Sequence, residues 1–232
     1  MSQTEHKVFF NKQTNSPART AIFLSGSGTN AEKVLELWKE EGSSCEFIPA
    51  CLVTDRPGRC RAEELAEKFN VELVSLDIRQ FYKDRGLENT SLASAAERRV
   101  RDEWSTELSS KIQPYNIDFG IFAGFIPLSN ITNDFPCLNV HPGDLTELDD
   151  KGKRLLIGLH TLPIQTAVLN DFAYLRTSVI VATPYEGEGA GMDEGFVLGI
   201  SPAVKIDWQR KTPEELISIY KNRPTLKPKG GW

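Results

Sequence analysis

The segment Asn139-Val140-His141-Pro142-Gly143 places a carboxamide and an imidazole two residues apart, directly after an apolar run. Because side chains alternate along an extended strand, Asn139 and His141 are expected to project from the same face. A carboxamide can donate a hydrogen bond to a developing oxyanion, and an imidazole can carry a charge or a proton. The pair suits transfer of a one-carbon acyl group to an amine, although both residues could equally be polar groups at a strand end.

A second candidate site is the glycine-rich segment from Ser25 to Ala31, with the sequence Ser-Gly-Ser-Gly-Thr-Asn-Ala between an apolar run and an amphipathic stretch. At such a strand-to-helix turn, backbone N–H groups and the helix dipole bind anions, which predicts a phosphate site. The same letters fit the dinucleotide pattern G-x-G-x-x-A, with Asp55 as a ribose-binding acid. A nicotinamide-dependent oxidoreductase is therefore the main alternative, but Asp55 comes later than that pattern requires. A turn that packs helix on strand without a ligand is the third interpretation.

Composition narrows the class of protein. The chain has 232 residues, 40% hydrophobic and 25% charged, which is typical of a folded globular protein with one large α/β domain. A net charge of −5 argues against nucleic acid or an anionic membrane as a partner. The four cysteines form no CxxC pair, so we expect neither a metal site nor a disulfide scaffold. The N-terminus lacks the plan of a signal peptide, and a cytoplasmic enzyme is expected.

In the first half of the chain, strand-like runs alternate with helical periodicity. Strands are expected at 20–24, 47–53, 71–76 and 117–125, and helices at 31–38, 62–69 and 91–112. The third helix is expected to bury Leu92, Ala96, Trp104, Leu108 and Ile112, and to expose the basic residues Arg98, Arg99 and Arg101. This order predicts an α/β fold with a Rossmann-like, mostly parallel sheet and flanking helices.

The second half is less regular. Short strands are expected at 137–141, 177–182 and 196–200, and a helix at 163–170. A glycine-containing loop covers 185–191, and Thr212-Pro213-Glu214-Glu215 has the pattern of a capping box. We therefore divide the chain into an N-terminal extension (1–19), one α/β domain (20–222) and an irregular C-terminal tail (223–232).

Four segments resemble the glycinamide ribonucleotide formyltransferase family and occur in the same order. They are the turn Ser25 to Asn30, Ala123-Gly124-Phe125, Leu138 to Pro142, and the segment Asp193 to Leu198 with the sequence Asp-Glu-Gly-Phe-Val-Leu. The resemblance spans about residues 20 to 200. It implies a Rossmann-like formyltransferase domain that moves a formyl group from the cosubstrate 10-formyltetrahydrofolate to a primary amine. In purine biosynthesis that amine is glycinamide ribonucleotide.

The resemblance also implies roles for individual residues. Asn139, His141 and Asp193 would be the catalytic set, in which Asp193 favours the charged form of His141 and helps to move a proton. Gly28, Thr29 and Asn30 would cradle the phosphate of the amine substrate. Phe125, Ile126 and the loop before Asp193 would receive the folate pterin.

Departures from the family concern the acceptor side. Residues 143–157 form a long, charged segment where family members have a short Leu-Pro segment. We predict that this segment is a surface loop that shapes the access of the acceptor. Pro127 replaces a basic residue, and Ile180 lies where the family tends to have histidine. Acceptors other than glycinamide ribonucleotide remain open, such as an amino sugar, another amine, or water in formyltetrahydrofolate hydrolysis. A binding module without catalysis is a further alternative, and the sequence does not specify an oligomeric state.

Overall fold

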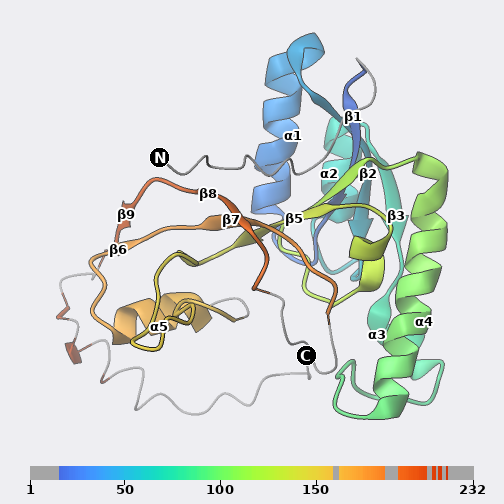
Figure 1. Cartoon of the computed structure of the whole chain (residues 1–232). Helices are drawn as coiled ribbons and strands as arrows, with labels where there is room; N and C mark the ends of the chain where they lie inside the picture. Colours follow the sequence, from blue (N-terminus) through green and yellow to red (C-terminus); the bar gives the residue numbers. More distant parts are fainter. Residues whose placement is uncertain are drawn as a thin grey trace, which may run out of the picture.

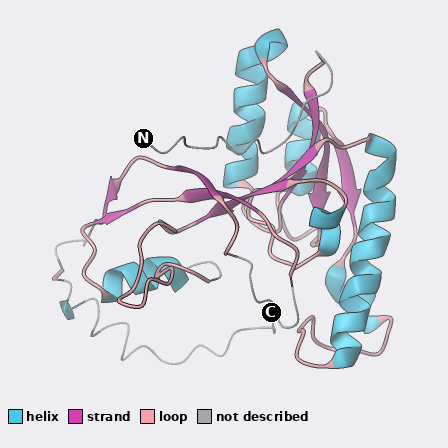
Figure 2. Ribbon diagram, viewed as in Figure 1, coloured by secondary structure: helices cyan, strands magenta, loops and turns pink. Residues whose placement is uncertain are grey.

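The computed structural model describes residues 16–158, 162–185 and 193–207, together with positions 211, 212, 214, 215 and 218. Most of the N-terminal extension, the glycines of the 185–191 loop and the tail 223–232 lie outside the described residues. Figure 1 shows the chain coloured by sequence and Figure 2 shows its helices and strands. Within the described ranges, every helix is too short or too polar to cross a membrane.

The centre of the fold is a seven-stranded sheet with the order β3-β2-β1-β4-β5-β7-β8. The five strands from β3 to β5 are parallel, β7 pairs antiparallel with β5, and β8 pairs antiparallel with β7. This confirms the predicted α/β class and mostly parallel sheet. The strands are β1 (Ala18–Phe23), β2 (Phe47–Thr54), β3 (Glu72–Ser75), β4 (Phe119–Phe122), β5 (Cys137–His141), β7 (Ser178–Val181) and β8 (Val197–Ile200).

Helices cover both faces of the parallel strands, which explains why the buried positions of these strands are largely apolar. α1 (Thr29–Glu41) and α2 (Ala62–Phe69) pack on one face, and α3 (Ile78–Lys83) and α4 (Ala95–Ile112) on the other (Figure 1). Ile22 and Leu24 belong to the first core, and Phe23 and Trp104 to the second. The remaining elements are α5 (Leu162–Leu169), which lies below β6 and β7 in Figure 1, the two-stranded pair β6 (Tyr174–Leu175) and β9 (Val204–Lys205), and 3-10 turns at Gly42–Ser44, Gln113–Tyr115 and Asn130–Asn133.

The start of α4 was predicted too early. Ser94 caps the helix, because its Oγ accepts from the Glu97 N–H at 3.2 Å and the Glu97 carboxylate accepts from the Ser94 N–H at 2.8 Å. Leu92 therefore precedes the helix, and Ala96 is exposed. The buried stripe consists instead of Val100, Trp104, Leu108 and Ile112.

Arg101 is buried, contrary to its predicted place on a solvated face. Only 4% of the residue is exposed, and its guanidinium donates to the Thr90 carbonyl at 2.6 Å, the Leu128 carbonyl at 3.0 Å and the Tyr82 hydroxyl at 3.1 Å. These acceptors satisfy the buried guanidinium, which the helical periodicity had predicted to lie on the exposed face of α4. Arg101 thereby fixes the backbone at Leu128, two residues after Ile126.

The capping box predicted after β9 is present. The Thr212 N–H donates to the Glu215 carboxylate at 2.8 Å, and the Glu215 N–H donates to Thr212 Oγ1 at 3.2 Å, while Pro213 lies outside the described residues. At the other end of the domain, Ala18 and Arg19 already pair with β2. The sheet therefore includes the last two positions that we assigned to the N-terminal extension.

Candidate active site

The carboxyl ends of β1, β4 and β5 meet at one edge of the sheet, where ligands of open α/β sheets bind. Asn139 pairs in register with Phe122 on β4 and with Ile180 on β7, and His141 pairs with Ser178. A pocket of about 400 Å³ opens at this edge. Its lining includes every predicted site residue except Gly28 and Thr29, namely Asn30, Phe125, Ile126, Asn139, His141 and Asp193.

His141 is held on both ring nitrogens. Its Nδ1 lies 3.2 Å from Asp193 Oδ1, and its Nε2 lies 2.6 Å from the Leu156 carbonyl oxygen. Both partners are hydrogen-bond acceptors, so only a ring protonated on both nitrogens donates in both contacts. His141 is 2% exposed, and a ring in that state is a positive charge held in a fixed place beside the pocket.

Asp193 is anchored independently of the histidine. Its Oδ2 accepts from the Gly158 N–H at 2.8 Å, and the Arg154 guanidinium donates to its backbone carbonyl. Burial acts to raise the pKa of Asp193. Hydrogen bonds from His141 and Gly158, with the charges of His141 and Arg154, outweigh burial and lower that pKa below its usual range. The carboxylate is therefore ionised and oriented at neutral pH.

Asn139 faces the same pocket from β5 and is half-buried. Within the described part of the chain, its carboxamide makes no hydrogen bond to protein, which leaves both N–H donors available to a bound group. The pair predicted from the two-residue spacing is thus on one face of the strand, with Asn139 toward the pocket and His141 deeper.

The Phe125-Ile126 corner forms the opposite wall. The Phe125 ring packs edge-on to Phe23 with 5.2 Å between centroids and stacks on Trp104 at 6.3 Å. The Ile126 N–H donates to Ser25 Oγ at 2.9 Å, and this hydroxyl donates to Asp55 Oδ1 at 2.5 Å. The corner is thereby tied to the ends of β1 and β2.

The Asp55 carboxylate is buried and accepts a hydrogen bond from Ser25, whereas a ribose-binding acid would be open to a ligand. Asp55 is 3% exposed, and burial raises its pKa to about 6 although the Ser25 hydroxyl acts in the opposite direction. This geometry disfavours the dinucleotide interpretation of the glycine-rich turn.

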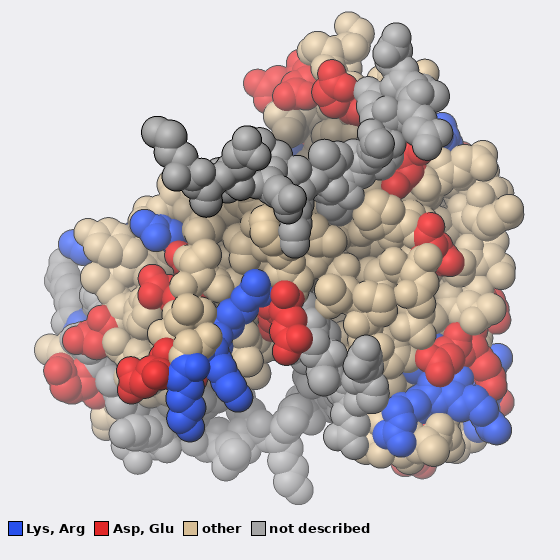
Figure 3. All heavy atoms as spheres, in the orientation of Figure 1, with Lys and Arg blue, Asp and Glu red and all other residues tan. Residues whose placement is uncertain are grey.

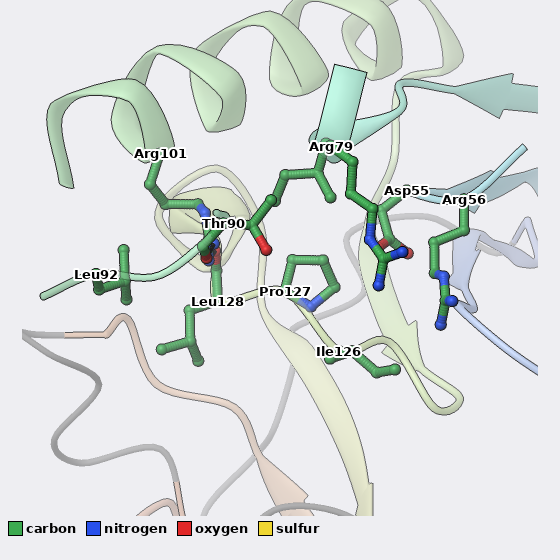
Figure 4. A pocket seen from close by; sticks show the side chains of 10 residues that line it. Asp55, Arg56, Arg79, Thr90, Leu92, Arg101, Ile126, Pro127 and Leu128 are labelled. Carbon is green, nitrogen blue, oxygen red and sulfur yellow. Dashed lines mark hydrogen bonds between the residues drawn. The ribbon is translucent and has the colours of Figure 1, made fainter. Parts of the chain in front are cut away.

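A second pocket of about 180 Å³ adjoins the first, and the two share Ile126, Pro127 and Leu128 as lining residues. In Figure 4 the side chains of Arg56 and Arg79 extend along the Asp55 side of this pocket, opposite the wall formed by the shared residues. Two guanidinium groups beside an apolar wall suit a ligand that has carboxylates at the end of an apolar body. The sequence carries no local signal for this extension, because its residues come from separate segments: Arg56 follows β2, Arg79 lies in α3 and Ile126 follows β4.

The glycine-rich turn has a structural reason for Gly28. Its φ is +66°, and a Cβ there would lie 2.9 Å from Leu65 Cδ1 and 3.1 Å from Leu24 Cδ1. Gly28 is the N-cap of α1 without a side-chain cap, so the first N–H groups of the helix point outward from this turn. Thr29 Oγ1 lies 3.2 Å from Ser27 Oγ, whereas Asn30 is the member of the turn that lines the pocket.

The segment 143–157 is only partly the predicted surface loop. Leu145 is 2% and Leu156 1% exposed, and the Leu156 carbonyl contacts His141. The exposed part is the middle of the segment, around Leu148 to Lys153. Its ends therefore belong to the site, which the run of charged letters did not indicate.

Tyr185, the first residue of the 185–191 loop that was expected to receive the pterin, also lines the pocket. Its hydroxyl donates to Asp102 Oδ1 at 2.7 Å and so links the segment after β7 to α4. Figure 3 shows Lys and Arg beside Asp and Glu over the visible face, without a broad basic field. On this face, an anion would have to be held by local groups.

Comparison with known proteins identifies the architecture. No protein-family model and no curated protein sequence matches the chain. Among solved structures, it is similar to glycinamide ribonucleotide transformylase 1 from Symbiobacterium toebii, with a TM-score of 0.63 and 22% identity over 88% of this chain and 81% of that chain. Phosphoribosylglycinamide formyltransferase from Bacillus halodurans gives a TM-score of 0.56 and 26% identity over 88% and 87% of the two chains. The enzyme of that name from Brucella melitensis gives 0.60 and 20% over the same shares.

Proposed function

We propose that this chain, which has the formyltransferase fold, transfers a formyl group from 10-formyltetrahydrofolate to a primary amine, with glycinamide ribonucleotide as the acceptor. The observation that carries the proposal is the convergence of Asn139, His141 and Asp193 on one pocket, with His141 Nδ1 3.2 Å from the Asp193 carboxylate. Asp193 comes from a segment far along the chain from Asn139 and His141, so their meeting supports a shared chemical role.

The chemistry needs stabilisation of one negative charge and movement of one proton. The amine nitrogen forms a bond to the formyl carbon, and the carbonyl oxygen becomes an oxyanion. The Asn139 carboxamide donates to this oxyanion, and the charged His141 ring stabilises it through space. When the intermediate collapses, the bond from carbon to the folate nitrogen breaks, and that nitrogen takes the proton that the attacking amine loses. Asp193 balances the charge of His141 throughout.

The shape of the pocket supports a folate donor. Phe125, Ile126 and Leu128 form an apolar wall for a flat ring, and the adjoining pocket continues along the same wall toward Arg56 and Arg79. A tetrahydrofolate carries its glutamate carboxylates at the end opposite the pterin. The two guanidinium groups are suited to that end of the molecule.

The acceptor would enter beside Asn30. The N-terminus of α1 directs backbone N–H groups outward from this turn, and such a terminus binds phosphate. Arg61 lies next to the turn, with its guanidinium 3.3 Å from the Ser27 carbonyl oxygen and 2.8 Å from Glu32. The phosphate of a ribonucleotide amine would therefore meet N–H donors and a cation that is already paired.

The test is a direct assay of the purified chain with 10-formyltetrahydrofolate and a panel of amines. We expect tetrahydrofolate to accumulate only with an amine present, and mass analysis to find the formyl group on glycinamide ribonucleotide. His141→Asn is the matched inactive control. Amine-independent loss of the formyl group would indicate hydrolysis, formylation of another amine would reassign the acceptor, and no consumption of the donor would refute the proposal.

A further inference from the structure

We propose that Arg154 is a positioning residue, which fixes the backbone of residues 193–195 and thereby aims the Asp193 carboxylate at His141. The inference rests on the proposed function only for the roles of His141 and Asp193. Arg154 lies in the segment 143–157, where the chain departs most from the family it resembles, so the role belongs to this chain's own loop.

The segment that carries Arg154 is a small hairpin. Leu148 and Arg154 form an antiparallel bridge, the Leu155 N–H donates to the Glu147 carbonyl at 2.9 Å, and the Asp149 N–H donates to the Lys153 carbonyl at 2.7 Å. At its tip, Asp149 Oδ1 accepts from the Lys151 and Lys153 N–H groups at 2.9 and 2.8 Å. These bonds give Arg154 a defined place opposite Leu148.

The base of the hairpin is attached to the sheet. Ser178 on β7 donates from its Oγ to the Gly143 carbonyl at 2.8 Å and accepts from the Leu145 N–H at 2.9 Å. A Cβ on Gly143 would lie 2.6 Å from the Leu156 carbonyl oxygen, so glycine lets the two ends of the segment approach closely. The hairpin is thus fixed relative to β5, which carries His141.

From this base, one guanidinium reaches two carbonyls. Arg154 Nη1 donates to the Asp193 carbonyl, and Nη2 donates to the Gly195 carbonyl at 2.9 Å. The rigid fork of arginine fixes both oxygens at once, which a single ammonium cannot do. On the opposite side, a Cβ on Gly195 would lie 1.8 Å from the Val181 carbonyl oxygen, so the 193–195 backbone is pressed against β7.

The same segment also holds the carboxylate itself. The Gly158 N–H donates to Asp193 Oδ2, which leaves Oδ1 directed at His141 Nδ1. The charged groups that face Asp193 are His141 from β5 and Arg154 from the hairpin. Residues 154–158 therefore hold the backbone of Asp193 and one of its carboxylate oxygens, and they supply one of the charges near it. Arg154 acts on the chemistry through Asp193.

The variants are Arg154→Met, which removes the fork, and Arg154→Lys, which keeps the charge. Lys153→Met is the matched control, because it removes an exposed charge from the same hairpin. For formyl transfer by the full chain, we expect turnover in Arg154→Met to fall roughly 10-fold to 100-fold with little change in the KM for 10-formyltetrahydrofolate. Arg154→Lys should recover only part of the loss, and Lys153→Met should match the unmodified chain.

A second readout separates this inference from the proposed function. The carboxylate carbon of Asp193 is followed by NMR against pH, with Asp193→Asn identifying its signal. Removal of Arg154 is expected to raise the pKa of Asp193, because one of the charges that lower it is lost. An unshifted titration in folded Arg154→Met, or Arg154→Lys equal to the unmodified chain in both readouts, would overturn the positioning role. If the unmodified chain transfers no formyl group, the proposed function fails while the titration still decides the role of Arg154.

Discussion

Replacing Asp193 with asparagine tests whether the site works through the charge of His141. In the unmodified chain, the carboxylate accepts from His141 Nδ1 and from the Gly158 N–H, and His141 Nε2 faces the Leu156 carbonyl. The introduced carboxamide can accept from Gly158 through its oxygen and donate to His141 Nδ1 through its nitrogen. A neutral ring with its proton on Nε2 then satisfies every partner, including the Leu156 carbonyl.

The expected result follows from this exchange of partners. Because no buried polar group loses its hydrogen bond, the free energy of unfolding at neutral pH should change by only about 1 kcal/mol. If the proposed formyl transfer uses a doubly protonated His141, the variant loses that positive charge beside the oxyanion, and removal of one such stabilising group typically costs about 2.7–4 kcal/mol of barrier, or roughly 10²–10³ in turnover. Binding of 10-formyltetrahydrofolate should be nearly unchanged, since the apolar wall is intact.

The assay is single-turnover formyl transfer across pH, with thermal unfolding of the same samples. The lowered pKa of Asp193 contributes stability that is present above the usual carboxyl range and lost as pH falls through the folded-state pKa. The variant should therefore lack that part of the acid destabilisation. In the double variant with His141→Asn, the loss should be smaller than the product of the single losses. A near-normal rate, or strictly multiplicative losses, would show that the three residues do not act as a unit.

Three further outcomes follow from the geometry. Gly28→Ala should lower the free energy of unfolding by about 1–3 kcal/mol in denaturant titrations, because of its positive φ and the 2.9 Å approach to Leu65; normal stability would contradict the packing role. Asn30→Ala should raise the KM for glycinamide ribonucleotide and leave folate affinity unchanged in binding titrations, and the reverse pattern would put the acceptor elsewhere. Asp55→Asn should stabilise the chain at neutral pH by about 1–3 kcal/mol, because a carboxyl with a folded pKa of about 6 opposes folding as pH rises from about 4 to 6; an unchanged pH profile of stability would refute this.

The order of strands and helices could be predicted because burial produces recognisable sequence patterns, an apolar run in a buried strand and an apolar stripe on one face of a helix. Residues 21–23 of β1 form a fully buried apolar run, and α2 shows a helical stripe of Ala62, Leu65 and Phe69. α3 was missed because it has six residues inside a polar stretch, and only the Asp77 cap marks its start. Arg101 was misplaced because two of its three acceptors are backbone carbonyls, which the residue types do not reveal.

In the candidate site too, residues on one strand could be predicted from the sequence, and residues that act through the backbone could not. Asn139 and His141 are two residues apart on one strand, so alternation alone places them together. Asp193 could be predicted only from the resemblance to the formyltransferase family, because it lies far along the chain from His141 and the fold brings the two together. Leu156, Gly158 and Arg154 escaped prediction because they act through one backbone carbonyl, one backbone N–H and contacts to carbonyls. Such contacts place few demands on the side chains of neighbouring residues.

We therefore expect the hairpin to affect both acceptor preference and the chemical step, which the sequence assigned to separate parts of the chain. Replacing its exposed tip, residues 149–152, with a two-residue turn leaves Arg154, Leu156 and Gly158 in place, because the bridge between Leu148 and Arg154 lies below the tip. This change should alter preference among amine acceptors and leave turnover with the best acceptor within several-fold. Deleting residues 149–156 should instead reduce turnover at least roughly 10²-fold. This deletion removes both the Leu156 carbonyl that contacts His141 and the Arg154 guanidinium that holds the Asp193 backbone. Both variants are compared by single-turnover transfer to a panel of amines, with folate binding as the control. Equal losses from the two changes would mean that the tip, and not the base, organises the site.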